Sequence, residues 1–291
     1  MKAYTKLGSI TLLLVAALAI TGCAQSAAVP IWETLPKPAA LPLADESGLA
    51  NIDDIQMWYA IFNKGGGEPV LLVHGGLGSA DNWGNQVSEL AQHHQVIVAD
   101  SRGHGRSTRS DKPFSYELMA NDYVALLDYL KIERVAIVGW SDGGIIGLDI
   151  AMRSADRVAK LWAFGANTSH LGLKENFGEH PVFVAATAEL GAEYKRLSPT
   201  PNDYDGFLAA IGRMWETQPN YKPEAISRIA TPTVIAVGEY DEAIKSEHSE
   251  EIVRLIPGAK LLVLPSVSHY APWQNPQLVN REIQAFLDSE A

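Results

Sequence analysis

The sequence predicts an α/β fold in which a mostly parallel sheet is flanked by helices on both faces. Short apolar runs bounded by turn residues recur along the chain, as buried parallel strands do. Stretches with apolar residues at helical spacing lie between these runs. Alternation of this kind builds a parallel sheet, because each return to the sheet crosses one of its faces as a helix.

The expected elements follow in order along the chain. The expected strands cover residues 55–62, 70–73, 96–99, 135–138, 161–164, 233–237 and 261–264. The expected helices between them cover residues 83–93, 116–131 and 145–151. From about residue 169 to 229 no strong strand appears, and two helical stretches lie near 185–196 and 203–217. An insertion of this size between two strands predicts a helical cap.

Composition and charge exclude several classes of protein. Of the 291 residues, 47% are hydrophobic and 20% are charged, which is typical of a globular protein. The formal net charge is −11 and no run rich in Lys or Arg is present, which disfavours nucleic acid as a partner. No closely spaced cluster of His, Cys and carboxylates suggests a metal site, and we expect neither a metal nor a cofactor.

The first 22 residues have the features of a signal peptide. Lys2 and Lys6 supply a basic start, and residues 7–20 are mostly apolar. This run is short for a transmembrane helix, which needs about 20 residues, but it suits the core of a signal peptide. The sequence that ends at Cys23 resembles the lipobox of bacterial lipoproteins. In those proteins the cysteine becomes the lipidated first residue of the mature chain.

Cys23 is the only cysteine, so the folded domain contains no disulfide, although an exported protein could form one. The alternative is a signal peptide that ends near a cysteine by chance. Ala24 stands where an inner-membrane retention signal would have Asp, so we expect a lipid-anchored protein of the outer membrane or cell surface. Residues 23–45 are rich in Pro and Ala and predict a semi-extended tether, followed by a domain over residues 46–291.

The most informative motif lies around Ser141. An apolar strand leads into Gly139-Trp140-Ser141-Asp142-Gly143, and helical spacing follows. A serine at such a sharp turn from strand to helix takes a strained conformation that exposes its hydroxyl and requires small neighbours. Gly139 and Gly143 meet this requirement, so Ser141 is the candidate nucleophile. The alternative is a tight turn with an unreactive serine.

A second glycine-rich turn could stabilise an oxyanion. Residues 74–79 read His-Gly-Gly-Leu-Gly-Ser and directly follow the strand that ends at Val73. We expect the backbone N–H groups of Gly76 and Asp142 to form the oxyanion hole, with Leu77 as the next candidate donor. Leu77 and Trp140 are also candidates for contact with the substrate. His74 is expected to brace this loop and not to act as the base.

The candidate acid and base follow the last two strands. Asp241 comes just after the strand at 233–237, and His269 follows the strand at 261–264. His269 would accept the proton of Ser141, while Asp241 would fix the tautomer of the imidazole and stabilise its charged form. Glu239 is the alternative acid. The remaining histidines are expected to be surface or loop residues: His93, His94, His104, His170, His180 and His248.

With these motifs the chain resembles α/β-hydrolases over about residues 46–290. The nucleophile, acid and base occur in the order Ser, Asp, His, as that family requires. The resemblance implies the α/β-hydrolase fold with an inserted helical cap over about 169–229. It also implies a structural role for Asp100 and Arg102 in the loop at 100–107. The turn at residues 139–144, which contains Ser141, and the segment Gly165-Ala166-Asn167 are similar to the corresponding segments of valacyclovir-hydrolase-like and aminopeptidase-like esterases.

The resemblance implies hydrolysis of a carboxylic ester through an acyl-enzyme, with a small-molecule ester or related acyl compound as substrate. The same residues could act on a small amide or a lactone, so an aminopeptidase or a lactonase is the enzymatic alternative. A non-catalytic, ligand-binding member of the fold is the alternative of another class. A serine in place of an aspartate nucleophile disfavours the haloalkane dehalogenase and epoxide hydrolase branches.

The side chain of Asp142 has two possible roles, because a carboxylate beside the nucleophile opposes a developing oxyanion. It could bind a cationic substrate group, such as the ammonium of an aminoacyl ester. It could instead point away and pair with an arginine or with backbone donors of the cap.

Overall fold

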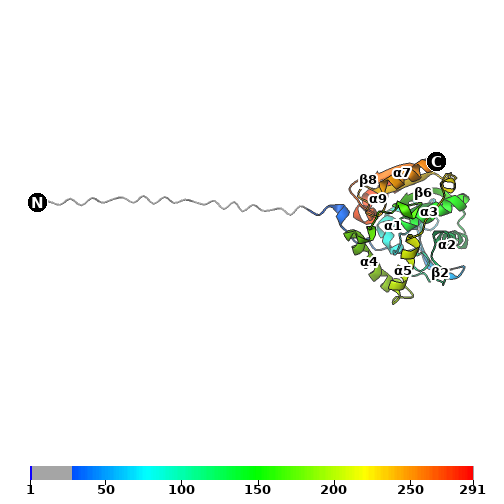
Figure 1. The fold of residues 1–291 in the computed structure, drawn as a ribbon. Coiled ribbons are helices and arrows are strands. Elements are labelled where there is room, and N and C mark those ends of the chain that lie inside the picture. The colour runs from blue at the N-terminus through cyan, green and yellow to red at the C-terminus, as the bar shows by residue number, and fades with distance from the viewer. Residues whose placement is uncertain (2–27, 291) are drawn as a thin grey trace.

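Eight strands form one sheet in the computed structural model, which describes residue 1 and residues 28–290 (Figure 1). Their order across the sheet is β1-β2-β4-β3-β5-β6-β7-β8. The strand β2 is antiparallel to both of its neighbours. The six strands β4, β3, β5, β6, β7 and β8, in their order across the sheet, are parallel to one another. The strands are β1 (Glu46–Ile52), β2 (Ile55–Phe62), β3 (Pro69–Val73), β4 (Gln95–Ala99), β5 (Val135–Trp140), β6 (Val158–Phe164), β7 (Thr233–Gly238) and β8 (Lys260–Leu264).

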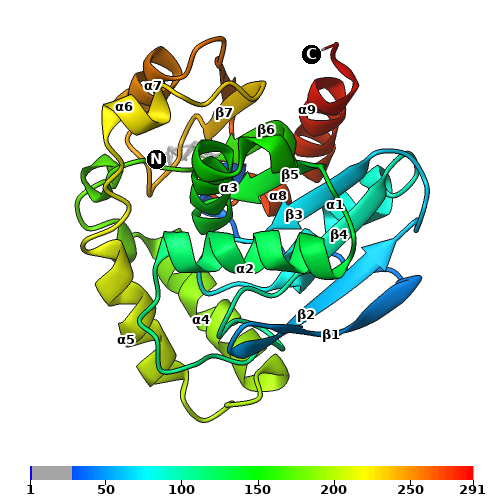
Figure 2. The same cartoon turned by 90° about the vertical axis from the view of Figure 1, so that its right-hand side faces the viewer.

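Helices cover both faces of this sheet. Helices α2 and α3 pack together on one face, and α1 and α9 pack together on the other (Figure 2). The helices are α1 (Gly84–Leu90), α2 (Tyr116–Tyr129), α3 (Asp142–Arg153), α4 (Pro181–Leu197), α5 (Tyr204–Trp215), α6 (Pro223–Ile226), α7 (Ser246–Leu255), α8 (Ala271–Gln274) and α9 (Pro276–Asp288).

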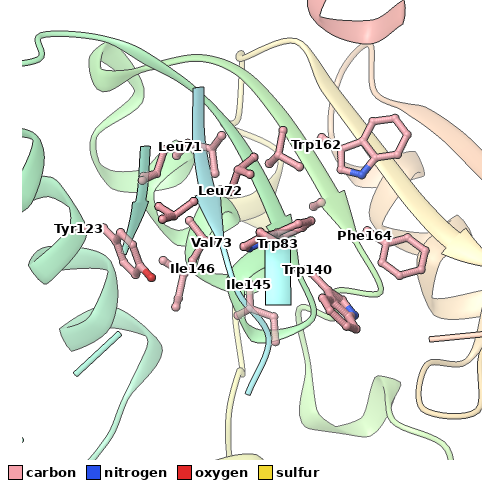
Figure 3. Close-up of a cluster of buried hydrophobic side chains, with 14 of the residues drawn as sticks. Leu71, Leu72, Val73, Trp83, Tyr123, Trp140, Ile145, Ile146, Trp162 and Phe164 are labelled. Carbon is pink, nitrogen blue, oxygen red and sulfur yellow. The ribbon is translucent and has the colours of Figure 1, made fainter. Parts of the chain in front are cut away.

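The core lies between the sheet and these two layers. The strands β3 and β5 are buried along nearly their whole length, which explains why they read as continuous apolar runs. Figure 3 shows Leu71, Leu72 and Val73 in the same cluster of buried side chains as Trp83 and Trp140. The end of the strand that leads to Ser141 is thus fixed by close packing.

The insertion between β6 and β7 contains the two long helices α4 and α5, which lie side by side away from the sheet (Figures 1 and 2). Aromatic rings join this cap to the body. Phe207 of α5 stacks on Tyr194 of α4, with ring centroids 4.8 Å apart, and meets His104 of the body edge-on at 4.7 Å. The predicted fold, a mostly parallel sheet between helices with an inserted helical cap, is confirmed.

Two elements differ from the expectation. Strand β1 was not predicted, because its residues include Gly48 and Asn51, which favour turns over strands. It forms a hairpin with β2 across a turn in which Asp53 has a positive φ of 48°. Helix α3 begins at Asp142, three residues before the predicted helix, because the glycines after Ser141 conceal the start of the apolar pattern.

The described part of the Pro- and Ala-rich segment lies along the domain. Trp32 stacks on Tyr240, with ring centroids 4.0 Å apart, and the backbone N–H of Ala39 donates to Asn85 Oδ1 at 3.0 Å. Lys37 forms an ion pair of 2.9 Å with Glu189 of α4. Residues 30–45 therefore contact both the body and the cap, whereas the sequence predicted a semi-extended tether.

The predicted signal peptide at 1–22 and the candidate lipidation site Cys23 lie outside the described residues, except for Met1. Among the described residues, no helix is long and apolar enough to cross a membrane.

Candidate active site

Ser141 lies at the turn between β5 and α3 in a strained backbone conformation. Its φ of 56° and ψ of −119° are rare for any residue with a side chain, and its N–H donates to Phe164 O at 2.7 Å. A side chain at Gly139 would collide with the backbone of Gly143, and one at Gly143 would collide with the carbonyl of Val73. The two glycines are therefore needed for this turn, as the sequence predicted.

His269 and Asp241 are in direct contact. Nδ1 of His269 lies 2.9 Å from Oδ2 and 3.2 Å from Oδ1 of Asp241. Oδ1 also accepts the backbone N–H groups of Ala243 and Ile244, at 2.9 and 2.8 Å. Both side chains are nearly fully buried. The carboxylate is thus held in place by the chain that follows it, and it leaves Nε2 of the imidazole free for another partner.

The alternative acid, Glu239, points elsewhere. Its carboxylate is exposed and accepts the backbone N–H of Ser266 at 2.8 Å. Glu242, which the sequence did not single out, is buried and accepts the backbone N–H of His269 at 3.0 Å. Asp241 is therefore the carboxylate that contacts the imidazole.

The charges around His269 favour its protonated form. Burial lowers the pKa of His269, but the charge and hydrogen bond of Asp241 raise it, and the charges of Glu242 and Asp142 add to this effect. The net result is a pKa above the usual value for histidine. An imidazole that gains a proton readily in this place is suited to act as a general base.

Ser141 and His269 line the same small cavity, of about 40 Å³. Three of the predicted site residues, Gly76, Leu77 and Trp140, line it as well. The described hydrogen bonds do not include one between the Ser141 hydroxyl and His269. Catalytic hydrogen bonds of this kind are often long without substrate and tighten in the complex.

The cap supplies the other wall of the cavity, through Phe183, Thr187 and Leu190 of α4 and Trp215 of α5. A larger groove of about 500 Å³ lies beside the cavity, and the described segment 37–42 forms part of its wall. Leu190 lines both spaces. The sequence predicted a cap but not which of its side chains reach Ser141, because that depends on how the two helices dock.

The N–H groups of Gly76 and Asp142 face no protein acceptor within the described residues, as an oxyanion hole requires. Asp142 is the first residue of α3, where backbone donors lack partners inside the helix. Leu77 also leaves its N–H without an acceptor in the described part of the chain, and it has a positive φ of 64°. A buried leucine with a positive φ is strained, and backbone strain of this kind is typical of loops at functional sites.

The Asp142 side chain is buried and pairs within the protein. Its Oδ1 accepts the Tyr116 hydroxyl at 2.8 Å, and both carboxylate oxygens lie 3.0 Å from Nε1 of Trp215. It is not among the residues that line the cavity. The partner on the cap is thus an indole, neither an arginine nor the backbone. The sequence pattern offered no signal for Tyr116 or Trp215, which lie 26 and 73 residues away.

Burial raises the pKa of Asp142 to about 6, although the hydrogen bonds from Trp215 and Tyr116 and the charge of His269 lower it. The carboxylate is therefore mostly ionised at neutral pH and gains a proton in mildly acidic solution.

The neighbouring loops are fixed by buried polar side chains. Nε2 of His74 accepts the backbone N–H of Ser101 at 2.9 Å, and Nδ1 lies 2.8 Å from Gly75 O, so this imidazole braces two loops. Burial lowers the pKa of His74. Asp100 accepts the N–H groups of Ala80 and Arg106, at 2.8 and 2.7 Å.

Arg102 forms a two-pronged ion pair with Asp122 of α2, at 2.6 and 2.8 Å, and joins the loop at 100–107 to that helix. Two of the histidines that were expected at the surface or in loops are buried: His104 lies in the loop at 100–107, as expected, whereas His248 lies in helix α7. The ring of His104 packs between aromatic residues, and Nε2 of His248 accepts the N–H of Thr168 at 3.0 Å. The described residues contain no cluster of three or more potential metal ligands.

Comparison with known proteins agrees with this geometry. A family model described as "alpha/beta hydrolase fold" matches residues 68–183. The human serine hydrolase BPHL is 27% identical over 244 residues, which cover 79% of this chain and 82% of that protein. The esterase YbfF of Escherichia coli is 24% identical over 246 residues, which cover 78% of this chain and 95% of that protein.

Two solved structures resemble the chain closely. The meta-cleavage product hydrolase of Pseudomonas fluorescens superposes with a TM-score of 0.73, at 21% identity, over 84% of this chain and 98% of that one. Est816, an N-acyl homoserine lactone degrading enzyme, superposes with a TM-score of 0.65, at 26% identity, over 83% of this chain and all of that one. The chain therefore has the α/β-hydrolase fold and is similar over most of its length to serine hydrolases and esterases.

Proposed function

We propose that the chain is a serine hydrolase that cleaves a carboxylic ester through an acyl-enzyme. In this proposal Ser141 is the nucleophile, His269 is the general base and then the general acid, and Asp241 orients His269. The N–H groups of Gly76 and Asp142 form the oxyanion hole. The observation that carries the proposal is the strained Ser141, which shares a cavity with an imidazole whose other nitrogen is held by a buried carboxylate.

In the first half of the reaction, Oγ of Ser141 attacks the ester carbonyl carbon and its proton moves to Nε2 of His269. The carbonyl oxygen becomes an oxyanion that accepts the two backbone N–H groups. Asp241 stabilises the imidazolium without taking its proton. The C–O bond to the alcohol then breaks, and the alcohol leaves with the proton from His269, so that Ser141 remains acylated.

In the second half, His269 takes a proton from water, and the resulting hydroxide attacks the acyl carbon. The same two N–H groups stabilise the second oxyanion. The bond to Oγ breaks, Ser141 regains a proton from His269, and the carboxylic acid leaves. No metal or redox group takes part in this sequence.

Steady-state hydrolysis of p-nitrophenyl esters tests the proposal. The variant Ser141→Ala should lose about 10⁴-fold or more in kcat, since loss of a triad member removes the nucleophile. Asp156→Asn, at an exposed residue of the short 3-10 helix after α3, serves as a control that should keep wild-type rates. If Ser141→Ala retained a tenth of the wild-type rate, the assigned nucleophile would be wrong.

A lactone is the second candidate substrate, and the 26% identity with the lactone-degrading Est816 favours it. A lactone is a cyclic ester, so the same residues would act, but the leaving alcohol would stay attached to the acyl group. Parallel rates for γ-lactones and for open-chain esters of equal size distinguish the two. A kcat/KM for the lactone that exceeds the ester value would assign the chain as a lactonase.

We also propose that Cys23 anchors the protein to a membrane of the bacterial cell envelope after removal of residues 1–22. The support is the basic and apolar pattern of that segment and the single cysteine at its end. Stable attachment takes more than one acyl chain, and the lipoprotein cysteine that this site resembles carries several.

A further inference from the structure

The cavity that holds Ser141 is small. Its volume of about 40 Å³ compares with roughly 300–1,000 Å³ for a typical ligand pocket. It leaves room for a few waters or for a short acyl group. One of its walls is the indole of Trp215, which comes from the last residue of α5.

The indole of Trp215 is held by a carboxylate from the body of the protein. Nε1 lies 3.0 Å from both oxygens of Asp142, and the Tyr116 hydroxyl donates to the same carboxylate at 2.8 Å. Asp142 and Tyr116 are almost fully buried. A hydrogen bond to an ionised group away from water is strong, so the carboxylate fixes the position of the ring.

The fixed ring lies directly against the oxyanion loop. A Cβ atom placed on Gly76 would lie 2.5 Å from Cζ2 of Trp215 and 2.6 Å from Oδ2 of Asp142. In the proposed reaction the substrate carbonyl oxygen points at the N–H of Gly76. That carbonyl carries an acyl group and an alkoxy group, and the indole limits the space for the substituent on its side.

We propose that Asp142 is a positioning residue that holds the indole of Trp215 against the oxyanion loop. The held indole restricts the site to esters with a small acyl group. This inference rests on the proposed ester hydrolysis and adds the substrate class to it. Asp142 thus has two roles: its side chain contributes to selectivity for the acyl group, and its backbone N–H belongs to the oxyanion hole.

The ratio of kcat/KM for p-nitrophenyl hexanoate to that for p-nitrophenyl acetate tests the proposal, because both esters have the same leaving group. The wild-type protein should prefer the acetate. Trp215→Ala should raise the ratio by about tenfold or more, since added methylenes then find space. Trp215→Phe keeps an aromatic wall but loses the N–H donor, and it should raise the ratio by about threefold.

Asp142→Asn should raise the ratio to a similar extent as Trp215→Phe. The double variant should raise it no further than Trp215→Phe alone, because Asp142→Asn weakens, by removing its charge, the same hydrogen bond that Trp215→Phe removes. Asp149→Asn is the matched control. Asp149 lies on the same helix, is buried, and accepts the hydroxyl of Tyr221 at 2.9 Å, but it does not contact the cap indole. Its ratio should equal that of the wild type.

Three results would overturn the proposal. A wild-type protein that prefers the hexanoate would show that the wall does not limit the acyl group. Thermal denaturation shows whether Trp215→Phe and Asp142→Asn are folded. If they are, an unchanged hexanoate-to-acetate ratio would show that the hydrogen bond between Asp142 and Trp215 does not set selectivity. Additive effects in the double variant would show that Asp142 does not act through Trp215. If Ser141→Ala is inactive in these cases, only this inference fails; if Ser141→Ala remains active, the proposed function fails with it.

Discussion

Replacement of Asp142 by asparagine should change how the stability of the protein depends on pH. Burial raises the pKa of Asp142 to about 6 in the folded protein, against 3.8 for an exposed aspartate. The folded state therefore keeps this proton over a pH range in which the unfolded chain has released it. This contribution to stability is fully present below pH 3.8 and is lost as the pH rises through about 6.

The size of the effect follows from the two pKa values. Between pH 5 and pH 7.5 the wild-type protein should lose about 1.4 kcal/mol of unfolding free energy through this one group. The asparagine variant has no proton to release there and lacks this loss. The free energy of unfolding of the wild type minus that of Asp142→Asn should therefore fall by about 1.4 kcal/mol over this range.

Urea unfolding of both proteins at the two pH values measures this difference, and contributions from groups that do not interact with Asp142 cancel to first order. The contribution of His269 does not cancel, because the charge of Asp142 raises the pKa of that imidazole, and its removal changes the difference in the same direction. The variant Trp215→Phe provides a check on the sign. It removes a hydrogen bond that favours the charged form of Asp142, so its stability should fall further than that of the wild type over the same range. A difference that stays constant with pH, or rises, would refute the buried, proton-binding carboxylate.

Four more substitutions have specific expected results. Asp241→Asn should lower kcat by about 10⁴-fold, while Glu239→Gln should retain most activity, and the reverse order of rates would reassign the acid. Because the charge of Asp241 raises the pKa of the His269 imidazole, Asp241→Asn should also move the acidic limb of the pH–rate profile to lower pH. Gly84→Ala places a methyl group against the carbonyl of Ala39, so it should lower the melting temperature and expose the segment before residue 45 to protease. An unchanged digestion pattern would contradict the packing of this segment on the domain. Cys23→Ser should abolish incorporation of radiolabelled palmitate and leave a poorly processed precursor. A wild-type protein found entirely soluble with a free thiol would exclude the anchor.

The fold and the Ser, Asp and His positions could be predicted because each depends on local sequence. Buried parallel strands are continuous apolar runs, and the turn around Ser141 requires glycines on both sides. Asp241 and His269 follow the ends of their strands, and the carboxyl ends of parallel strands meet at one edge of the sheet. These signals need no knowledge of how distant segments pack.

The environment of Asp142 could not be predicted for the opposite reason. Its partners come from α2 and from the cap, and an indole N–H or a phenol in a helix gives no pattern that marks it as a partner. The path of residues 30–45 was also missed. Prolines predict extended backbone, but whether that backbone leaves the domain or packs on it depends on surface complementarity.

Labelling by a fluorophosphonate probe tests the central claim most directly, since the probe reacts covalently only with an activated serine. The protein from residue 28 onward should be labelled once, and peptide mass spectrometry should place the adduct on Ser141. His269→Ala should reduce the rate of labelling by at least about a hundredfold, because the hydroxyl loses its base. Absence of labelling in the folded protein, or an adduct on another residue, would contradict the assignment of Ser141 as the nucleophile.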